Sequence, residues 1–365
     1  MSSPFFYFGR DLMITVKVGG SSLRTKTDFL NVRDIIKSDE RRKAVVVSSP
    51  GRRFENDEKV TDLLISACEG EFSTEIEKAV ERFRLIFEGL SCEKNAEKEL
   101  LLLKSANEKG LYRDFILSRG EYISALIMAH LLDFKLIDAK DVIFFKRNGK
   151  VDEERSREAL RTFFSLYKRI VIPGFYGQNF DGRIKTFPRG GSDITGSLVS
   201  SFLNAEKYEN MTDTEGLFKY PPKFFSLSPA TKVLSLYDLK LLAHFGASVF
   251  NEGAVKPLIK YNVPLEIKNT FSLKSGTFAF KEVFLPEAVT GVGFLEKEHH
   301  SLILITGKAM AEGSNEAFIL NSLSSEAVEI SALFANRKTP SLIIKVPNAY
   351  FKKALCIVYK ITALF

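Results

Sequence analysis

A lysine followed closely by two glycines could bind phosphate near the start of the chain. Lys17 precedes Gly19, Gly20 and Ser21 at the end of a run of β-forming residues, and a helical pattern follows. Glycine lets backbone N–H groups approach an anion closely, and the N-terminus of a helix favours negative charge. The alternative is a tight strand-to-helix turn with a surface lysine. This is not a Walker A loop, because the lysine comes before the glycines.

A second candidate site is Arg189-Gly190-Gly191-Ser192-Asp193, which leads directly into a helical pattern. Ser192 or Asp193 could simply cap that helix. Capping leaves the arginine and the two glycines unexplained. Arginine offers a planar fork that can bind a carboxylate or phosphate through two hydrogen bonds. Asp193 could orient a cation or a substrate amine, so this segment is predicted to bind a charged substrate.

Two further segments place acidic and hydroxyl side chains at the ends of expected elements. Glu121 follows Leu117-Ser118-Arg119-Gly120, and we place it in the first turn of a helix. There it could complement the helix dipole, or it could accept hydrogen bonds from a substrate ammonium. Thr212 and Asp213 follow an expected strand. They could be simple turn residues, or they could bind a nucleotide at the carboxyl end of the sheet.

Alternating strands and helices are expected to position these segments. Strands are expected at 13–18, 44–48, 142–145, 169–172, 208–212, 263–267 and 277–280. Helical spacing of apolar residues is found near 29–36, 60–67, 74–108, 123–131, 194–202 and 234–244. This alternation predicts a three-layer α/β/α fold with a largely parallel sheet. From about residue 288 the pattern changes to strand, helix, strand, strand, helix, which predicts a small α+β domain.

Composition limits the classes of protein that this chain can belong to. Its 365 residues suggest about two domains, and 45% hydrophobic with 27% charged residues is typical of a globular protein. The net charge of +7 is small and spread along the chain, so nucleic-acid binding is not expected. Three distant cysteines, without a CxxC pair, support neither a metal site nor a disulfide framework. We expect no signal peptide and no membrane span, and therefore a cytoplasmic protein.

The order and spacing of the candidate segments resemble those of the aspartate kinase family, in the amino-acid kinase superfamily. The matching segments are KVGGSS at 17–22, VVVSSPG at 45–51, VTDLL at 60–64, LSRGE at 117–121, IPGFYG at 172–177, RGGSD at 189–193, TDTEG at 212–216 and FGA at 245–247. The resemblance runs in order from about residue 13 to 280. The C-terminal region resembles one ACT domain, a small-molecule sensor that aspartate kinases carry at this end.

The resemblance implies an activity and a division of the chain. The activity is transfer of the ATP γ-phosphoryl group to the β-carboxylate of L-aspartate, giving 4-phospho-L-aspartate on the route to lysine, threonine and methionine. Residues 1–12 would be an N-terminal extension, 13–287 a catalytic domain with the amino-acid kinase fold, and 288–365 a single ACT-like domain.

The resemblance also implies roles for individual residues. Lys17 and Asp193 would be catalytic, and Mg²⁺ would bridge the phosphates of ATP. Substrate binding is assigned to Thr61, Glu121, Arg189, Gly190, Gly191 and Ser192. Nucleotide binding is assigned to Lys17, Gly19, Gly20, Ser21, Thr212, Asp213, Phe218, Lys223 and Ser248. No protein ligand to a metal is assigned.

Several positions depart from the family pattern. Pro221-Pro222-Lys223 stands where the family usually has Asp-Pro-Arg, so a positive charge remains without the planar fork of arginine. Ser248 replaces a customary lysine, and Asn251-Glu252 replaces a His-Pro pair. These departures fall on the nucleotide side, whereas Lys17 and the RGGSD segment are intact.

Two other functions remain open from the sequence, and so does the role of the C-terminal region. The chain could be a related kinase with another acidic acceptor, such as glutamate, carbamate or UMP, or a non-catalytic amino-acid sensor. Aspartate kinases generally carry two ACT units, whereas this chain has room for one. Lysine or threonine is a possible effector there, and we expect a homodimer because a small domain of this kind exposes a sheet edge.

Overall fold

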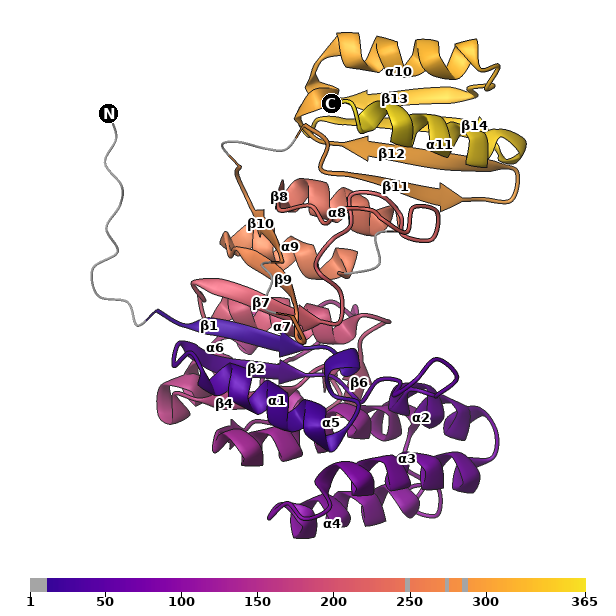
Figure 1. Cartoon of the computed structure of the whole chain (residues 1–365). Helices are drawn as coiled ribbons and strands as arrows, with labels where there is room; N and C mark the ends of the chain where they lie inside the picture. The colour runs from indigo at the N-terminus through magenta and orange to yellow at the C-terminus, as the bar shows by residue number, and fades with distance from the viewer. Residues whose placement is uncertain (1–11, 247–249, 273–275, 284–287) are drawn as a thin grey trace, which may run out of the picture. The chain divides into compact units, whose positions relative to one another are not determined.

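The apolar runs at the start of the chain form neighbouring buried strands. In the computed structural model, which describes residues 12–246, 250–272, 276–283 and 288–365, all five residues of β1 (Ile14–Val18) are buried. This strand pairs in parallel with β2 (Arg42–Val47), with Val16 opposite Val45 (Figure 1). Continuous apolar character is expected where helices cover both faces of a parallel sheet.

The chain divides into two compact units. The first unit comprises the residues up to Phe187 together with Val199–Glu209, and the second comprises Pro188–Leu198 and Asn210–Phe365. The strands of the large sheet follow the order β3-β4-β2-β1-β7-β9-β10-β8. The pairs β1–β2, β2–β4, β3–β4 and β8–β10 are parallel, whereas β9–β10 is antiparallel. The predicted α/β fold with a largely parallel sheet is therefore confirmed.

Most helices of the chain belong to the first unit. Helix α1 (Lys26–Lys37) begins with a capping box, in which Thr25 and Asp28 satisfy each other's backbone N–H groups. The remaining elements of this unit are η1 (Gly20–Ser22), α2 (Val60–Glu69), α3 (Phe72–Phe87), α4 (Glu93–Lys104), α5 (Arg113–Leu132), β3 (Lys135–Leu136), η2 (Ala139–Asp141), α6 (Glu153–Tyr167), β4 (Ile170–Pro173), β5 (Tyr176–Gln178) and β6 (Ile184–Thr186).

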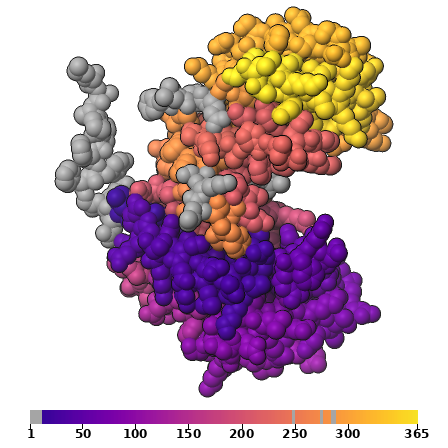
Figure 2. Space-filling view, in the orientation of Figure 1, coloured from indigo at the N-terminus to yellow at the C-terminus, as the bar shows by residue number. Residues whose placement is uncertain are grey.

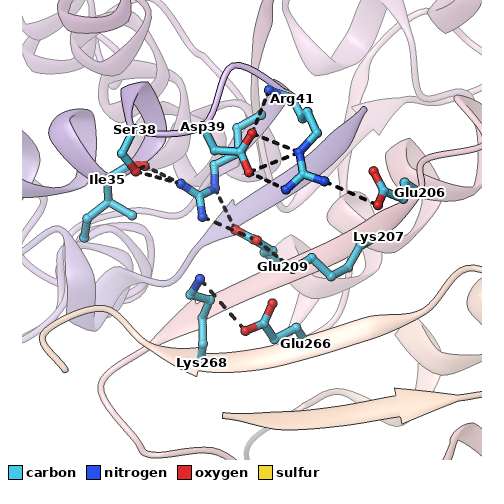
Figure 3. Close-up of polar contacts among 10 residues, drawn as sticks. Ile35, Ser38, Asp39, Arg41, Glu206, Lys207, Glu209, Glu266 and Lys268 are labelled. Carbon is cyan, nitrogen blue, oxygen red and sulfur yellow. Dashed lines mark hydrogen bonds and ion pairs between the residues drawn. The ribbon is translucent and has the colours of Figure 1, made fainter. Parts of the chain in front are cut away.

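A buried ion pair connects β2 with the start of β7 (Lys207–Thr212). Arg42 Nε donates to Glu209 Oε2 over 2.9 Å, and the two side chains are 9% and 1% exposed. Lys207 Nζ lies 3.0 Å from the other oxygen of Glu209. Arg42 also donates to the Ile35 carbonyl and to Ser38 Oγ at the end of α1 (Figure 3). One buried carboxylate therefore balances two cations where α1, β2 and β7 meet.

The second unit begins with the other half of the large sheet. It contains the first part of α7 (Gly191–Phe202), up to Leu198, and the second half of β7, from Asn210. Its further elements are β8 (Val233–Ser235), α8 (Leu236–His244), α9 (Glu252–Tyr261), β9 (Leu265–Asn269) and β10 (Thr277–Phe280). The C-terminal region follows with β11 (Gly291–Glu296), β12 (His300–Thr306), η3 (Lys308–Ala311), α10 (Gly313–Ser325), β13 (Ala332–Asn336), β14 (Ser341–Pro347), η4 (Asn348–Tyr350) and α11 (Phe351–Thr362).

The C-terminal region has its own antiparallel sheet, in the order β11-β12-β14-β13, and its own apolar core (orange to yellow in Figures 1 and 2). Tyr220, from the loop after β7, belongs to this core, and Phe224 and Phe225 pack against it. The ring of Phe225 stacks on that of Tyr359 in α11, with 4.2 Å between their centroids. The loop after β7 is therefore built into the C-terminal core.

Several sequence expectations were wrong in detail. The helical stretch 74–108 is two helices, because the chain turns at Gly89 with a φ of +72°. Residues 142–145 contribute only isolated bridges at Phe144 and Phe145, following a 3-10 turn. The helix expected over 234–244 begins at Leu236, after the short strand β8. Strand β11 precedes the strand, helix, strand, strand, helix order expected for the C-terminal region.

Helix α5 starts earlier than the sequence pattern predicts. It begins at Arg113, so Glu121 lies in its middle and not in its first turn. Almost every side of the helix is buried, so no apolar stripe marks its first two turns. In the described part of the chain, it is also the one helix long and apolar enough to cross a membrane. Most of that stretch is buried within the protein, as in a core helix.

Candidate active site

Two glycine-containing turns contact each other at the carboxyl ends of β1 and β2. The Gly51 N–H donates to the Gly20 carbonyl over 2.8 Å. A Cβ on Gly20 would lie 2.4 Å from the Ser49 carbonyl oxygen, and one on Gly51 would lie 2.7 Å from Gly20 backbone atoms. Only glycine allows this approach. We call the backbone of Gly19–Ser22 and Ser49–Gly51 the glycine cradle.

Two ionisable side chains lie near the glycine cradle. Lys17 is on β1, two residues before Gly19, and is 8% exposed. Glu121 on α5 is 4% exposed, and the Ser49 backbone N–H lies close enough to favour its ionised form. The adjacent Gly120 lets α5 approach, because a Cβ there would lie 2.5 Å from Ser49 Oγ. The first unit thus brings an ammonium-bearing strand, the cradle and a buried carboxyl group into one small region.

Glu121 is an unusual acid because one of its oxygens has no partner. Oε2 of Glu121 and Oγ of Ser49 are both buried without a hydrogen bond in the described part of the chain. Burial raises the pKa of Glu121 to about 8, despite the Ser49 N–H. Buried polar atoms are normally satisfied, so such a pair indicates a place where a ligand donates. Thr61, the second residue of α2, follows the cradle; Val60 N donates to the Pro50 carbonyl over 3.1 Å.

The second candidate segment forms a sharp turn before α7. Gly190 has a φ of +80°, a conformation that favours glycine, and a Cβ there would lie 2.4 Å from Asn251 Nδ2. That amide donates to the Arg189 carbonyl over 3.0 Å, while Asn251 Oδ1 caps α9 at Gly253. Helix α7 begins at Gly191, so the expectation that Ser192 or Asp193 caps it was wrong; both lie in its first turn. Asn251, noted only as a departure, holds this turn in place.

Asp193 has a partner that sequence reasoning missed. Asn210 on β7 places Nδ2 3.5 Å from Asp193 Oδ1. The Asn210 side chain is 1% exposed, and its Oδ1 has no hydrogen bond in the described residues. The sequence did contain a signal for Asn210, because an amide side chain stands in an otherwise expected strand. A buried polar group in a strand needs a hydrogen-bond partner or a function.

Thr212 and Asp213 lie at the carboxyl end of β7, as predicted. Thr212 Oγ1 donates to Asp213 Oδ1 over 3.2 Å, and Thr270 N donates to the Thr212 carbonyl over 2.8 Å. Asn269 at the end of β9, another residue missed from the sequence, donates to the Asp213 carbonyl over 3.2 Å. Phe218 is half-buried and bridges to Ala230. These contacts fix the polar groups that follow β7.

The remaining predicted residues have few described contacts or lie outside the described residues. Lys223 is exposed, with Nζ 5.5 Å from the centroid of the Phe224 ring. Ser248 lies outside the described residues. Lys17, the cradle, Thr61 and Glu121 belong to the first unit, whereas Arg189–Asp193 and Thr212–Asp213 belong to the second. Within the described ranges there is no group of three His, Cys, Asp or Glu side chains that could hold a metal ion.

Comparison with known proteins shows the family of this chain. The model of the amino acid kinase family matches residues 13–269. The chain belongs to the amino acid kinase family. As a member of this family it is 34% identical to aspartokinase 3 of Bacillus subtilis over 277 residues, which cover 71% of this chain and 61% of that protein. An aspartokinase of Thermus thermophilus is also 34% identical, over 56% of this chain and 53% of its own length.

Solved structures extend the similarity of this amino acid kinase to the whole chain. The aspartate kinase of Clostridium acetobutylicum has a TM-score of 0.82 at 27% identity, covering 97% of this chain and 100% of that one. Aspartokinase III of E. coli, solved with aspartate and ADP, shares the fold with a TM-score of 0.71 at 19% identity, over 92% of this chain and 79% of its own. The chain spans about three fifths of the length of the first curated relatives it matches.

Proposed function

We propose that this protein transfers the γ-phosphoryl group of ATP to the β-carboxylate of L-aspartate. The observation that carries this proposal is the buried, unpartnered Oε2 of Glu121 beside Ser49 and the glycine cradle. The backbone of the cradle suits a phosphate, and the Glu121 carboxyl group next to it suits an ammonium group. Together they favour a phosphoryl acceptor that bears an amino group. The 34% identity to an aspartokinase supports the choice of aspartate.

The transfer itself needs positioning and charge neutralisation more than acid–base chemistry. The β-carboxylate is already an anion, so no general base is required. Its oxygen forms a bond to the γ-phosphorus as the bond to the β,γ-bridging oxygen breaks and ADP leaves. Lys17 and the backbone of Gly19, Gly20 and Ser21 stabilise the charge that spreads over the transferred group.

A Mg²⁺ ion suits this site as a companion of the nucleotide. Mg²⁺ in phosphoryl-transfer sites keeps several waters and is bound through phosphates with one or two carboxylates. Asp193 supplies a carboxylate in the first turn of α7, a donor that suits this mode. When bound, the ion neutralises phosphate charge. Asp193, held by Asn210, is the carboxylate that we assign to orienting the reacting groups.

Recognition of aspartate requires opposite charges for its two α-substituents. We assign the α-ammonium to Glu121 and the α-carboxylate to the fork of Arg189, whose turn is fixed by Asn251. Thr61 and Ser192 supply neutral hydrogen bonds, and Gly190 and Gly191 supply backbone close enough to contact the substrate. Thr212, Asp213, Phe218, Lys223 and Ser248 are assigned to the nucleotide.

A panel of acceptors tests the substrate. The full chain is incubated with ATP, Mg²⁺ and one of L-aspartate, L-glutamate, carbamate or UMP, and acyl phosphates are trapped with hydroxylamine while ADP is measured. We expect trapped product and matching ADP release with aspartate alone. Turnover of glutamate without aspartate would move the assignment to a related kinase. Aspartate binding without any ADP release would assign a sensor.

The C-terminal region is proposed to be a single ACT-like domain that begins near residue 288, after a catalytic domain over 13–287. The E. coli aspartokinase III structure solved with lysine and aspartate makes an amino acid a sensible effector to test here. Phe334 is exposed on the edge strand β13, and we propose that this edge forms the contact of a homodimer. The proposed location of the protein is the cytoplasm. Lysine or threonine is expected to change the rate or the melting midpoint. If neither does, the region serves dimerisation alone.

A further inference from the structure

Arg82 on α3 is a buried arginine that the assigned reaction does not use. Its side chain is 5% exposed. One guanidinium nitrogen donates to the Gly51 carbonyl over 2.7 Å. The other donates to Asp57 Oδ2 over 2.6 Å and to the Glu58 carbonyl over 3.2 Å. The side chain therefore contacts the first and the last part of the exposed loop that follows Gly51.

Asp57 holds this arginine in place. The same carboxylate accepts from the backbone N–H and from Nε of Arg53, over 2.8 and 2.9 Å. Arg53 first, and Arg82 in addition, hold the pKa of Asp57 well below its usual range. Removing Asp57 from this buried, hydrogen-bonded pair would leave the Arg82 charge uncompensated, whereas Asp57 would retain Arg53 if Arg82 were removed. Arg82 thus pairs with Asp57 and also donates to two backbone carbonyls, those of Gly51 and Glu58.

Gly51 is held from opposite sides by this arrangement. Its carbonyl accepts from Arg82, and its N–H donates to the Gly20 carbonyl. The contact with Gly20 is so close that a Cβ on either residue would collide with backbone. A shift of Gly51 therefore displaces Gly20. Ser49, which lies beside Glu121, precedes Gly51 by two residues, and the neighbouring Ser48 N–H donates to the Val18 carbonyl over 3.1 Å, a contact that does not involve Arg82.

We propose that Arg82 is a positioning residue for the glycine cradle: it fixes Gly51, and through Gly51 the backbone of Gly20, in the orientation that binds the nucleotide phosphates. This proposal rests on the proposed function for the identity of the bound phosphates. The loop of residues 52–59 then contributes to catalysis without contacting the substrate, because Arg82 connects the two ends of this loop. A misplacement of about 1 Å in such a donor array can lower turnover by about 10²-fold.

The test compares Arg82→Ala, Arg82→Lys and Asp57→Asn with Arg84→Ala in the full chain. Arg84 is the matched control, because it lies on the same helix and pairs with Glu97 at the surface. Each variant is checked for folding by circular dichroism and thermal melting. Steady-state kinetics give kcat/KM for ATP and KM for aspartate, and calorimetry gives the affinity for a non-hydrolysable ATP analogue with Mg²⁺.

We expect Arg82→Ala to lower kcat/KM for ATP and analogue affinity by about tenfold or more, with KM for aspartate within about twofold of wild type. For Arg82→Lys and Asp57→Asn, kcat/KM for ATP and analogue affinity are expected to lie between those of Arg82→Ala and wild type, since each variant retains part of the contacts. These two variants test the proposal if Arg82→Ala does not fold. Wild-type values for all three folded variants, or an equal loss in Arg84→Ala, would overturn the proposal. If wild type itself phosphorylates no acceptor, the proposed function fails, while analogue binding still judges Arg82.

Discussion

Gly51 donates its backbone N–H to the carbonyl of Gly20 over 2.8 Å, so the turns after two adjacent parallel strands meet backbone to backbone. No side chain fits between them, since a Cβ on Gly51 would lie 2.7 Å from Gly20. The contact leaves the donors of the cradle in one fixed arrangement next to Lys17. Preorganised donors of this kind would need no rearrangement during the phosphoryl transfer that we propose.

Replacing Gly51 with alanine should damage both stability and catalysis. The new methyl group meets backbone atoms that cannot rotate away, so we expect a loss of about 1–3 kcal/mol in unfolding free energy. Turnover should fall by about 10²-fold, because the cradle must open. Gly313→Ala is the control, since its added Cβ has no atom nearer than 4.0 Å. Denaturant unfolding and steady-state rates check both; equal effects at the two positions would contradict this account.

Glu121→Gln should stabilise the free protein at neutral and alkaline pH. The folded pKa of about 8 lies above the usual value of 4.5, so folding favours the protonated acid. Its stabilising contribution is complete below pH 4.5 and is lost as the pH rises to about 8. Glutamine does not ionise, so its melting midpoint should exceed that of wild type at pH 8 and match it at low pH. Exposed Glu40→Gln serves as control. A lower midpoint for Glu121→Gln at pH 8 would show that the carboxylate is stabilised when folded.

The same group should shape the pH dependence of aspartate capture. In the free protein Glu121 must lose its proton before it accepts from the α-ammonium of aspartate. We therefore expect kcat/KM for aspartate to rise with pH, to reach half of its maximum at about pH 8, the pKa of Glu121, and to level off above it. The bound ammonium lowers that pKa, so kcat itself should not show this rise. A kcat/KM that stays flat up to pH 8 would remove Glu121 from ammonium binding.

Glu209→Ala should be among the more destabilising substitutions in the first unit. The carboxylate is 1% exposed and lies against Arg42 and Lys207, so its removal leaves two cations together. Breaking a buried pair in this way costs about 3–5 kcal/mol. Asp34→Ala, which removes an exposed partner of Arg33, should change the unfolding midpoint little. Chemical unfolding of the two variants distinguishes these cases, and equal midpoints would mean that Glu209 contributes little.

Those parts of the candidate site that are local in the chain could be proposed from the sequence. Residue types that are adjacent in the chain are enough to identify two candidate segments, namely Lys17 with its glycines and the RGGSD segment. The alternation of strands and helices likewise predicted a largely parallel sheet, and the parallel pairing of β1 and β2 agrees with it. Glu121 was identified by its motif, but its position in mid-helix was not, because a helix buried all round carries no apolar stripe.

The residues that were missed act across long separations in the chain. Asn210 meets Asp193 across 17 positions, Arg82 meets Gly51 across 31, and Asn251 meets Arg189 across 62. None of them has a local pattern of its own, since one amide or guanidinium among many becomes informative only when its partner is known. Asn251 illustrates this: as a departure from the family pattern it suggested altered nucleotide binding, whereas it holds the turn at Gly190.

The central claim is that this chain phosphorylates aspartate, and a single-turnover experiment tests it most directly. Enzyme in excess is mixed with Mg²⁺, L-aspartate and ATP labelled in the γ-phosphate, and labelled aspartyl phosphate is followed for wild type and for Lys17→Met. We expect wild type to convert the bound label to aspartyl phosphate, and Lys17→Met to be slower by at least about 10²-fold. Label that stays in ATP with wild-type protein, while aspartate is bound, would contradict the claim.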